Sequence, residues 1–178
     1  MSMKKSILAW LLCLSGWNMS VFAQETLAVS SIPDSLKKGA YSVVRRDELS
    51  FTMKSPKEGV LKGVQVITVL TGKGDGAAYF GYYGDTFREL KGFAGELYDG
   101  NGKLLRKLKR SELKFTELSD GLASDDRLYY YEPASPVYPY TVKYEYEVSY
   151  KSGILSYPAF RPQSVYNMSV EKAVYRLF

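Results

Sequence analysis

The sequence lacks the residue types that most catalytic and metal sites require. Its 178 residues include no histidine, one cysteine and two tryptophans. Cys13, Trp10 and Trp17 all lie near the N-terminus, in a segment that the sequence predicts to be removed. The remaining chain therefore has no thiol nucleophile, no histidine base, no disulfide framework and no cysteine–histidine zinc site. We expect a protein that is not an enzyme, with no catalytic residues, no metal site and no cofactor.

Long apolar runs are also scarce, and the longest one indicates an export signal. Lys4 and Lys5 precede the unbroken apolar stretch Ile7–Leu14, and Val21 and Ala23 stand at the positions that a signal peptidase reads. This stretch is far shorter than the roughly 20 residues of a membrane-spanning helix. The sequence predicts a secretory signal peptide at residues 1–23, no transmembrane segment in the mature chain, and export to the periplasm or the cell surface.

Positive charge is only in modest excess, with 24 lysines and arginines against 19 acidic residues. The densest basic cluster is Lys103–Arg110, which also contains three leucines. A nucleic-acid patch would need aromatic platforms or a groove-binding helix beside it. We interpret the cluster as a solvated strand edge that lysines protect from pairing, and we expect no nucleic-acid partner.

The first residues of the mature chain predict little regular structure. Residues 24–31 are polar and are expected to form a mobile N-terminal segment. Residues 31–39 carry the signals of one short helix, with Ser31 as N-cap, Pro33 in the first turn and Gly39 as the residue that ends it.

After Gly39 the pattern changes to the two-residue period of β-strands. Tyrosine and valine alternate with polar residues throughout Tyr140–Lys151. Val60–Thr71 has β-branched residues at both odd and even positions, as in a central strand that is covered on both faces. Pro158 and Pro162 should keep residues 157–163 out of regular ladders. Further strands are predicted at Tyr41–Lys54, Phe87–Tyr98, Lys103–Lys109 and Val165–Phe178, with tight turns at Ser55–Gly59 and Asp99–Gly102.

Six to eight strands with short connections predict a mainly β protein. We expect one domain over residues 32–178, an antiparallel β-sandwich or a strongly curved sheet with one short N-terminal helix. A domain of this size can bury enough surface to stand alone.

Three polar motifs could suggest chemistry but are better explained as turns. Gly72–Gly76 has the composition of a phosphate loop, yet strand-like residues follow it instead of a helix, so we interpret it as a flexible connection. A calcium loop starting at Asp99 would have Arg110 at its twelfth position, where glutamate is needed. The acidic residues Asp120, Asp125, Asp126 and Glu132 could form a glycosidase pair, but such a pair needs two carboxyls across a cleft, which sequence proximity does not supply. We interpret Asp120, Asp125 and Asp126 as parts of capped turns.

Two tyrosine-rich segments supply the candidate ligand-binding residues. A tyrosine ring offers an apolar plate with a polar tip, so these residues could stack on a sugar ring or an extended peptide. Alternatively, they fill the core and rim of the sandwich, as their β-propensity predicts. The absence of tryptophan from the mature chain weakens the sugar interpretation. The candidates are Tyr79, Tyr82, Tyr83, Tyr129, Tyr130 and Tyr131.

Several short motifs, in their order, carry a family resemblance. They are Tyr41–Glu48, Tyr98–Lys103, Ser124–Arg127, Tyr138–Tyr146 and Ser169–Lys172. From about Ser31 to its end, the chain resembles the bacterial domain of unknown function that precedes transglutaminase-like domains in exported proteins. The resemblance implies a β-sandwich-type domain followed by a cysteine-dependent transglutaminase-like or peptidase-like unit, and it supplies no catalytic residues. Such chains run on past the final strand, so we expect this one to be truncated at its C-terminal end, at Phe178.

Two functions follow as hypotheses. The first is a non-catalytic exported module that positions or recruits substrate for a transglutaminase-like or peptidase-like protein. The alternative is a free-standing module of the bacterial cell envelope that binds a glycan or an extended peptide, for which open strand edges could also serve.

Overall fold

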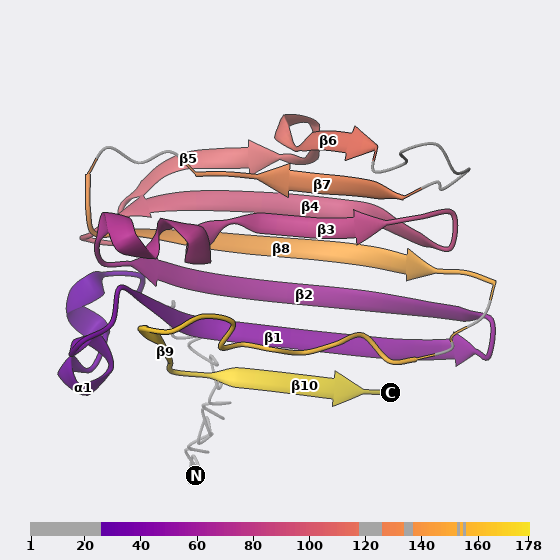
Figure 1. The fold of residues 1–178 in the computed structure, drawn as a ribbon, viewed down its shortest axis with the longest axis horizontal. Coiled ribbons are helices and arrows are strands. Elements are labelled where there is room, and N and C mark those ends of the chain that lie inside the picture. The colour runs from indigo at the N-terminus through magenta and orange to yellow at the C-terminus, as the bar shows by residue number, and fades with distance from the viewer. Residues whose placement is uncertain (1–25, 118–125, 134–136, 153, 155) are drawn as a thin grey trace, which may run out of the picture.

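A computed structural model describes residues 26–117, 126–133, 137–152, 154 and 156–178 (Figure 1). The predicted signal peptide lies outside these residues. Besides the helix α1 (Asp34–Lys37), they contain the short 3-10 helices η1 (Val29–Ser31), η2 (Gly72–Ala78) and η3 (Arg110–Glu112). The strands are β1 (Ser42–Ser55), β2 (Glu58–Val69), β3 (Phe80–Gly84), β4 (Arg88–Asp99), β5 (Leu104–Lys109), β6 (Lys114–Glu117), β7 (Arg127–Tyr131), β8 (Tyr140–Tyr150), β9 (Met168–Val170) and β10 (Ala173–Leu177).

The strands form two sheets, which confirms the mainly β fold class. The main sheet has the order β10-β1-β2-β8-β4-β5, with β9 also paired to β1, and the small sheet has the order β3-β7-β6. The neighbours from β1 to β5 are all antiparallel. The described residues hold ten strands instead of the expected six to eight, because β6 and β9 have only four and three residues. No described helix is long and apolar enough to span a membrane.

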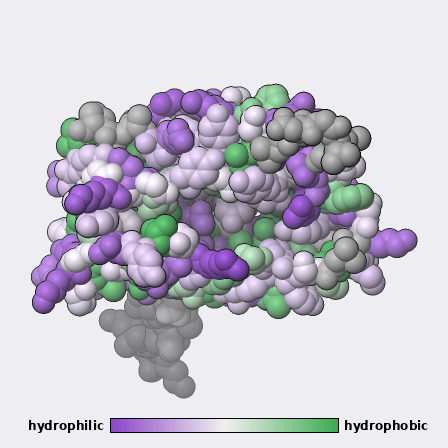
Figure 2. Space-filling model, in the orientation of Figure 1, coloured by the Kyte–Doolittle hydropathy of each residue, from purple (hydrophilic) through white to green (hydrophobic). Residues whose placement is uncertain are grey.

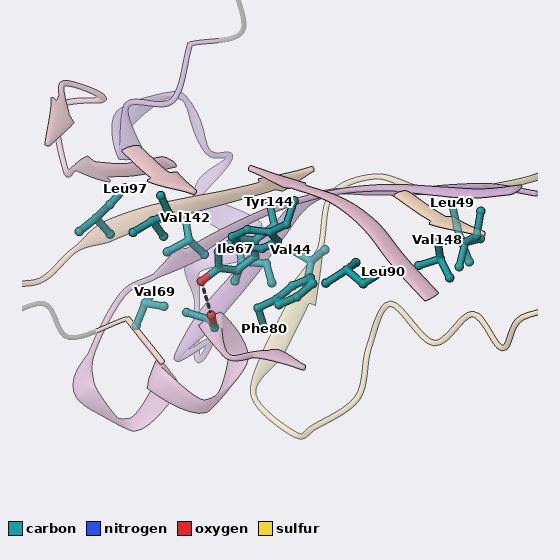
Figure 3. Packing of buried hydrophobic residues seen from close by; sticks show 14 of the residues in the cluster. Val44, Leu49, Ile67, Val69, Phe80, Leu90, Leu97, Val142, Tyr144 and Val148 are labelled. Carbon is teal, nitrogen blue, oxygen red and sulfur yellow. Dashed lines mark hydrogen bonds between the residues drawn. The ribbon is translucent and has the colours of Figure 1, made fainter. Parts of the chain in front are cut away.

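The small sheet packs on one face of the main sheet, and the hydrophobic core lies between them. The even positions of β8 face this core, so Tyr140, Val142, Tyr144 and Val148 are all buried. From the small sheet, Phe80 packs its ring against Phe93 and Tyr144, with ring centres 4.6 and 5.4 Å apart. Figure 3 shows Phe80 beside Tyr144, together with the hydrogen bond that the Tyr144 hydroxyl donates to the Ala78 carbonyl.

The N-terminal segment is tied to the main sheet by a buried arginine. The Arg45 guanidinium donates through Nη2 to the Thr26 carbonyl and to the Ser31 hydroxyl, both at 2.7 Å. The segment predicted to be mobile is therefore held by specific contacts where the structure describes it.

The predicted short helix forms as α1, but its N-cap differs from the prediction. Pro33 holds the N-cap position, and the Ser31 hydroxyl donates instead to the Ala28 carbonyl at 2.7 Å. Gly39, at φ +74°, follows the end of α1, as the sequence predicted.

The final segment does not form one continuous strand. Its two short strands, β9 and β10, both run parallel to β1. Between them, the Glu171 amide donates to the Val44 carbonyl and the Asp47 amide donates to the Lys172 carbonyl. This break lies opposite the bulge between Val44 and Arg46 in β1. A bulge adds a residue that an unbroken partner strand could not match, so the ladder resumes as a second strand.

The glycine-rich connection Gly72–Gly76 is ordered, which corrects the prediction of a flexible link. It forms most of η2, and the Asp75 carboxylate at its centre accepts hydrogen bonds from the hydroxyls of Tyr138 and Tyr140. The local sequence could not show this, because both tyrosines lie more than 60 residues further along the chain.

Glu48 links the edge strand β10 to β1 through a cluster of ion pairs. Its carboxylate lies 3.0 Å from Arg46 Nη2, 2.6 Å from Lys172 Nζ and 3.6 Å from Arg176 Nη1. Hydrogen bonds from Arg46 and then Lys172 lower the pKa of Glu48 to about 2, against a smaller opposing effect of burial.

We expect Glu48→Gln to lower the free energy of unfolding by about 1 to 2 kcal/mol at neutral pH. The loss is smaller than the full pKa shift implies, because solvent screens the half-exposed Lys172 and Arg176 side chains. A depressed folded pKa stabilises the protein above the unfolded value of roughly 4.3, and the stabilisation disappears as the pH falls through about 2. Urea unfolding curves of the two proteins should therefore converge in acid. A difference of equal size at neutral and acid pH would contradict this.

Candidate functional site: a tyrosine-lined cleft

A cleft of about 910 Å³ opens on the core face of the main sheet, beside the small sheet. β3 and the β3–β4 turn form one wall. The other wall comes from described residues that follow β8, namely Lys151, Ser152, Ile154 and Ser156–Ala159. The floor comes from β1, β2 and β8 through Leu49, Leu61, Tyr146 and Tyr150. Figure 2 shows this face hollowed near its middle, between the small sheet and the chain that follows β8. The cleft is therefore assembled from segments that are far apart in sequence.

The wall after β8 lacks strand structure but is fixed by specific contacts. Residues 157–163 form no ladder, as the two prolines predicted. The Ile154 amide donates to the Pro56 carbonyl at 3.1 Å, and the Tyr175 hydroxyl donates to the Pro158 carbonyl at 2.9 Å. The Tyr157 ring packs edge-on against Phe51, with ring centres 6.0 Å apart. The amides of Tyr157 and Ala159 make no hydrogen bond with any residue that the structure describes.

The opposite wall is shaped by a tight turn between β3 and β4. Asp85 Oδ1 accepts hydrogen bonds from the amides of Phe87 and Arg88 at 2.8 and 2.6 Å, and Oδ2 accepts from Arg88 Nε and Nη2 at 2.9 and 2.6 Å. Burial raises the pKa of Asp85, but the hydrogen bonds from Arg88 and the two amides outweigh it and leave the pKa below its usual value. The turn presents the Phe87 ring, which is 53% exposed, at the rim of the cleft.

Tyr82 contributes a buried hydroxyl to the lining of the cleft. Its hydroxyl is buried and makes no hydrogen bond of normal geometry within the described part of the chain. Burial raises the pKa of Tyr82, with a further contribution from the neighbouring Tyr150 hydroxyl, so the phenol stays protonated at physiological pH. A buried hydroxyl whose contact with Tyr150 lacks normal hydrogen-bond geometry is poorly satisfied, and a ligand carbonyl placed here would accept a better hydrogen bond.

The six candidate tyrosines do not form one site. Neighbouring residues of a strand point to opposite faces, so each tyrosine segment is divided between two sides of the small sheet. Tyr82 lies opposite Tyr129 in the ladder, and both pack against the core together with Tyr131. Of the six candidates, only Tyr82 and Tyr83 line the cleft.

The outward-facing tyrosines form a separate aromatic face. The Tyr79 and Tyr130 rings stack with centres 6.2 Å apart and planes at 22°, and Lys114 Nζ lies 5.9 Å from the centre of the Tyr130 ring. Tyr79 remains 37% exposed and Tyr83 62% exposed.

Sequence reasoning missed most of the aromatic residues that line the cleft. Tyr146 and Tyr150 lie on the face of β8 that the alternating sequence pattern assigned to the core. This pattern was the signal that could have placed them beside the cleft. Phe87, which the sequence placed at the start of a strand, lies in the turn before β4. Tyr157 lies in the connection after β8 and carried no periodic signal.

The acidic residues considered in the sequence analysis form no metal site in the described part of the chain. Asp120 and Asp125 lie outside the described residues. Within those residues there is no group of three or more histidine, cysteine, aspartate or glutamate side chains placed to hold a metal ion.

Residues 60–178 match a protein family described as a domain of unknown function with a solved structure, DUF3857. The chain belongs to this family. The match runs from β2 to Phe178 and includes every part of the cleft except Leu49 of β1. The family resemblance of the sequence is confirmed to this extent, and the transglutaminase context remains a prediction.

The fold resembles part of one larger protein of known structure and matches part of a second only weakly. One is a proposed protease from Parabacteroides distasonis ATCC 8503, with a TM-score of 0.53 and 11% identity over 64% of this chain and 24% of that one. The other is a mutant M1 zinc metallopeptidase from Deinococcus radiodurans bound to a Tyr-Ser-Ala substrate, with a TM-score of 0.29 and 10% identity over 66% of this chain and 22% of that one. This chain thus spans less than a quarter of either protein, and the second similarity is too weak to support an argument. No curated protein matches the sequence significantly.

Proposed function

We propose that the protein is a non-catalytic exported β-domain that recruits an extended peptide substrate to a peptidase-like or transglutaminase-like unit of a longer protein. The observation that carries the proposal is the tyrosine-lined cleft between β3 and the described residues that follow β8. Its volume is typical of ligand sites. The similarity to about a quarter of a proposed protease supports a place beside a peptidase-like unit.

The chemistry of the cleft favours a peptide with a bulky apolar side chain. Leu61, Ile154 and the tyrosine rings offer an apolar surface, and the Tyr82 hydroxyl can donate to a peptide carbonyl. The amides of Tyr157 and Ala159 can bind further backbone carbonyls, because no described residue engages them. An extended peptide uses both kinds of contact, since its backbone forms hydrogen bonds while alternate side chains fill pockets.

Blocking the cleft should abolish peptide binding without unfolding the protein. We expect saturation-transfer NMR to detect the tripeptide amides acetyl-Ala-Tyr-Ala and acetyl-Ala-Leu-Ala on the protein, and to detect acetyl-Ala-Ser-Ala weakly or not at all. The exposed Ala159 lines the cleft, so Ala159→Trp should weaken binding at least tenfold, about 1.4 kcal/mol or more. Ala173→Trp, an exposed alanine of β10 outside the cleft, is the matched control. Equal affinity of the two variants would argue against the proposal.

The outward-facing Tyr79 and Tyr130 pair favours a second candidate, a glycan-binding module of the cell envelope. Stacked, partly exposed rings beside a lysine are suited to a sugar ring. Under this alternative, a β-1,4-linked N-acetylglucosamine hexasaccharide would bind the native protein and Ala159→Trp equally, and Tyr130→Ala would lose it.

A further inference from the structure

A second pocket adjoins the cleft at the β3–β4 turn. It has a volume of about 470 Å³ and shares Asp85 and Arg88 with the cleft. Three arginines from three separate elements line it, namely Arg88 at the start of β4, Arg110 at the start of η3 and Arg127 at the start of β7. Guanidinium groups that converge from non-adjacent segments are typical of sites that bind oxyanions.

Two of the three arginines form no direct ion pair with a carboxylate of the pocket. Asp85 engages Arg88 through two hydrogen bonds. Arg110 and Arg127 form no ion pair or hydrogen bond through their side chains with any described residue. The other carboxylate of the pocket, Glu89, lies 2.6 Å from Lys91 and 3.8 Å from Lys151. Two guanidinium groups thus remain available to a ligand.

The unpaired guanidinium groups of the pocket suit a carboxylate ligand. Asp85 already engages Arg88, and Lys91 and Lys151 already engage Glu89. Arg110 and Arg127 are left to meet a ligand. A carboxylate can bind a guanidinium through both of its oxygens, and it is the anionic group that a peptide in the adjoining cleft carries. A carboxylate is therefore the ligand that fits the pocket and the cleft together.

We propose that this pocket binds a carboxylate group of the peptide that lies in the tyrosine-lined cleft. The inference rests on the proposed function and deepens it, because it names the substrate class as peptides with a carboxylate near the bulky apolar residue. Since Asp85 and Arg88 border both cavities, one ligand can reach both. The carboxylate comes either from a free C-terminus or from an acidic side chain, and the two sources are separable by experiment.

The test compares three peptides on the full chain by NMR titration at low salt. They are acetyl-Ala-Tyr-Ala with a free C-terminus, the same peptide as an amide, and acetyl-Ala-Tyr-Glu amide. We expect at least one of the two carboxylate peptides to bind about fivefold more tightly than acetyl-Ala-Tyr-Ala amide, as one good ion pair provides. The peptide that shows the advantage identifies the source of the carboxylate. High salt should reduce the advantage.

Variants then assign the effect to the pocket. The double variant Arg110→Gln with Arg127→Gln should lose the fivefold advantage while its affinity for the amide stays unchanged. Lys103→Gln removes a positive charge at the turn end of the β4–β5 hairpin, seven residues and roughly 23 Å along the strand from Arg110, and should keep the advantage.

The possible failures have different meanings. If no peptide binds, the proposed function fails and this inference fails with it. If all three peptides bind equally, or the double variant keeps the advantage, the carboxylate pocket is wrong and the cleft stands. Inorganic phosphate that competes more strongly than acetate would also overturn the carboxylate assignment.

Discussion

Replacing Gly74 with alanine is expected to lower the free energy of unfolding by about 2 to 3 kcal/mol. A Cβ at this position would lie 2.3 Å from the Tyr41 carbonyl oxygen and 2.8 Å from its carbonyl carbon. These are backbone atoms, and the same carbonyl accepts a hydrogen bond from the Leu70 amide at 2.9 Å. Neither side can give way without separating η2 from the start of β1.

Gly76 provides a matched control within the same 3-10 helix. A Cβ at Gly76 would meet no atom within 4 Å. Gly76→Ala should therefore leave stability unchanged or raise it by a few tenths of a kcal/mol, because alanine has less freedom to lose on folding. Urea unfolding followed by circular dichroism measures both variants. Similar effects of the two substitutions would contradict the packing of η2 on β1.

The second large effect is expected at Tyr144, where Tyr144→Ala should cost about 4 kcal/mol. This side chain is fully buried and packs against Phe80 and Phe93, so its loss would leave a cavity between the two sheets. Tyr144→Phe keeps the ring but leaves the buried Ala78 carbonyl without its 2.8 Å hydrogen bond, for an expected loss of about 1 to 2 kcal/mol.

The two Tyr144 variants separate the contribution of the ring from that of the hydroxyl. Tyr166, which is 96% exposed, is the control, and Tyr166→Ala should change stability by less than about 0.5 kcal/mol. Because domains of this size are stable by only about 5 to 15 kcal/mol, Tyr144→Ala should be recognisable from the unfolding midpoint alone. A loss below about 1 kcal/mol for Tyr144→Ala would mean that the small sheet does not pack here as described.

These two positions also bear on the cleft, because they hold its β3 wall in place. Gly74 fixes η2, which leads directly into β3, and Tyr144 holds Ala78 at the end of η2. β3 in turn carries Tyr82 and leads into the Asp85 turn. A ligand site on this scaffold is therefore preformed, which reduces the free energy that binding must spend on ordering.

The sequence predicted those parts of the fold whose signals are local. The turn between β4 and β5 is an example, because Asp99 Oδ1 accepts hydrogen bonds from the amides of Asn101 and Lys103, both at 2.9 Å, and Gly102 has φ +81°. The alternation of β8 predicted its buried face for the same reason. The cluster Lys103–Arg110 was also interpreted correctly as an edge strand, with Leu108 buried in β5.

Features that depend on distant partners could not be predicted. Arg45 and Asp47 are buried in β1, although a two-residue period assigns apolar side chains to such positions. Arg45 is buried because a bulge turns it toward the backbone of the N-terminal segment. Asp47 is buried beside Gln65, and burial raises its pKa against the lowering effect of that hydrogen bond.

The candidate site was only partly predictable for the same reason. Grouping tyrosines by sequence proximity combined residues that a strand sends to opposite faces, such as Tyr129 in the core and Tyr130 on the outer face. The cleft instead combines Leu49, Tyr82, Tyr150 and Tyr157, which only the completed fold brings together. Its aromatic character was predicted, but its location was not.

The most direct measurement of the central claim is the location of the bound peptide. We would record amide chemical-shift changes in the isotope-labelled chain as acetyl-Ala-Tyr-Ala is added. The account predicts that the largest changes occur at Tyr82, Phe87, Ser152 and Ala159, on the two walls of the cleft. Changes confined to Tyr79, Tyr130 and Lys114, on the outer tyrosine face, or no changes at saturating peptide, would contradict it.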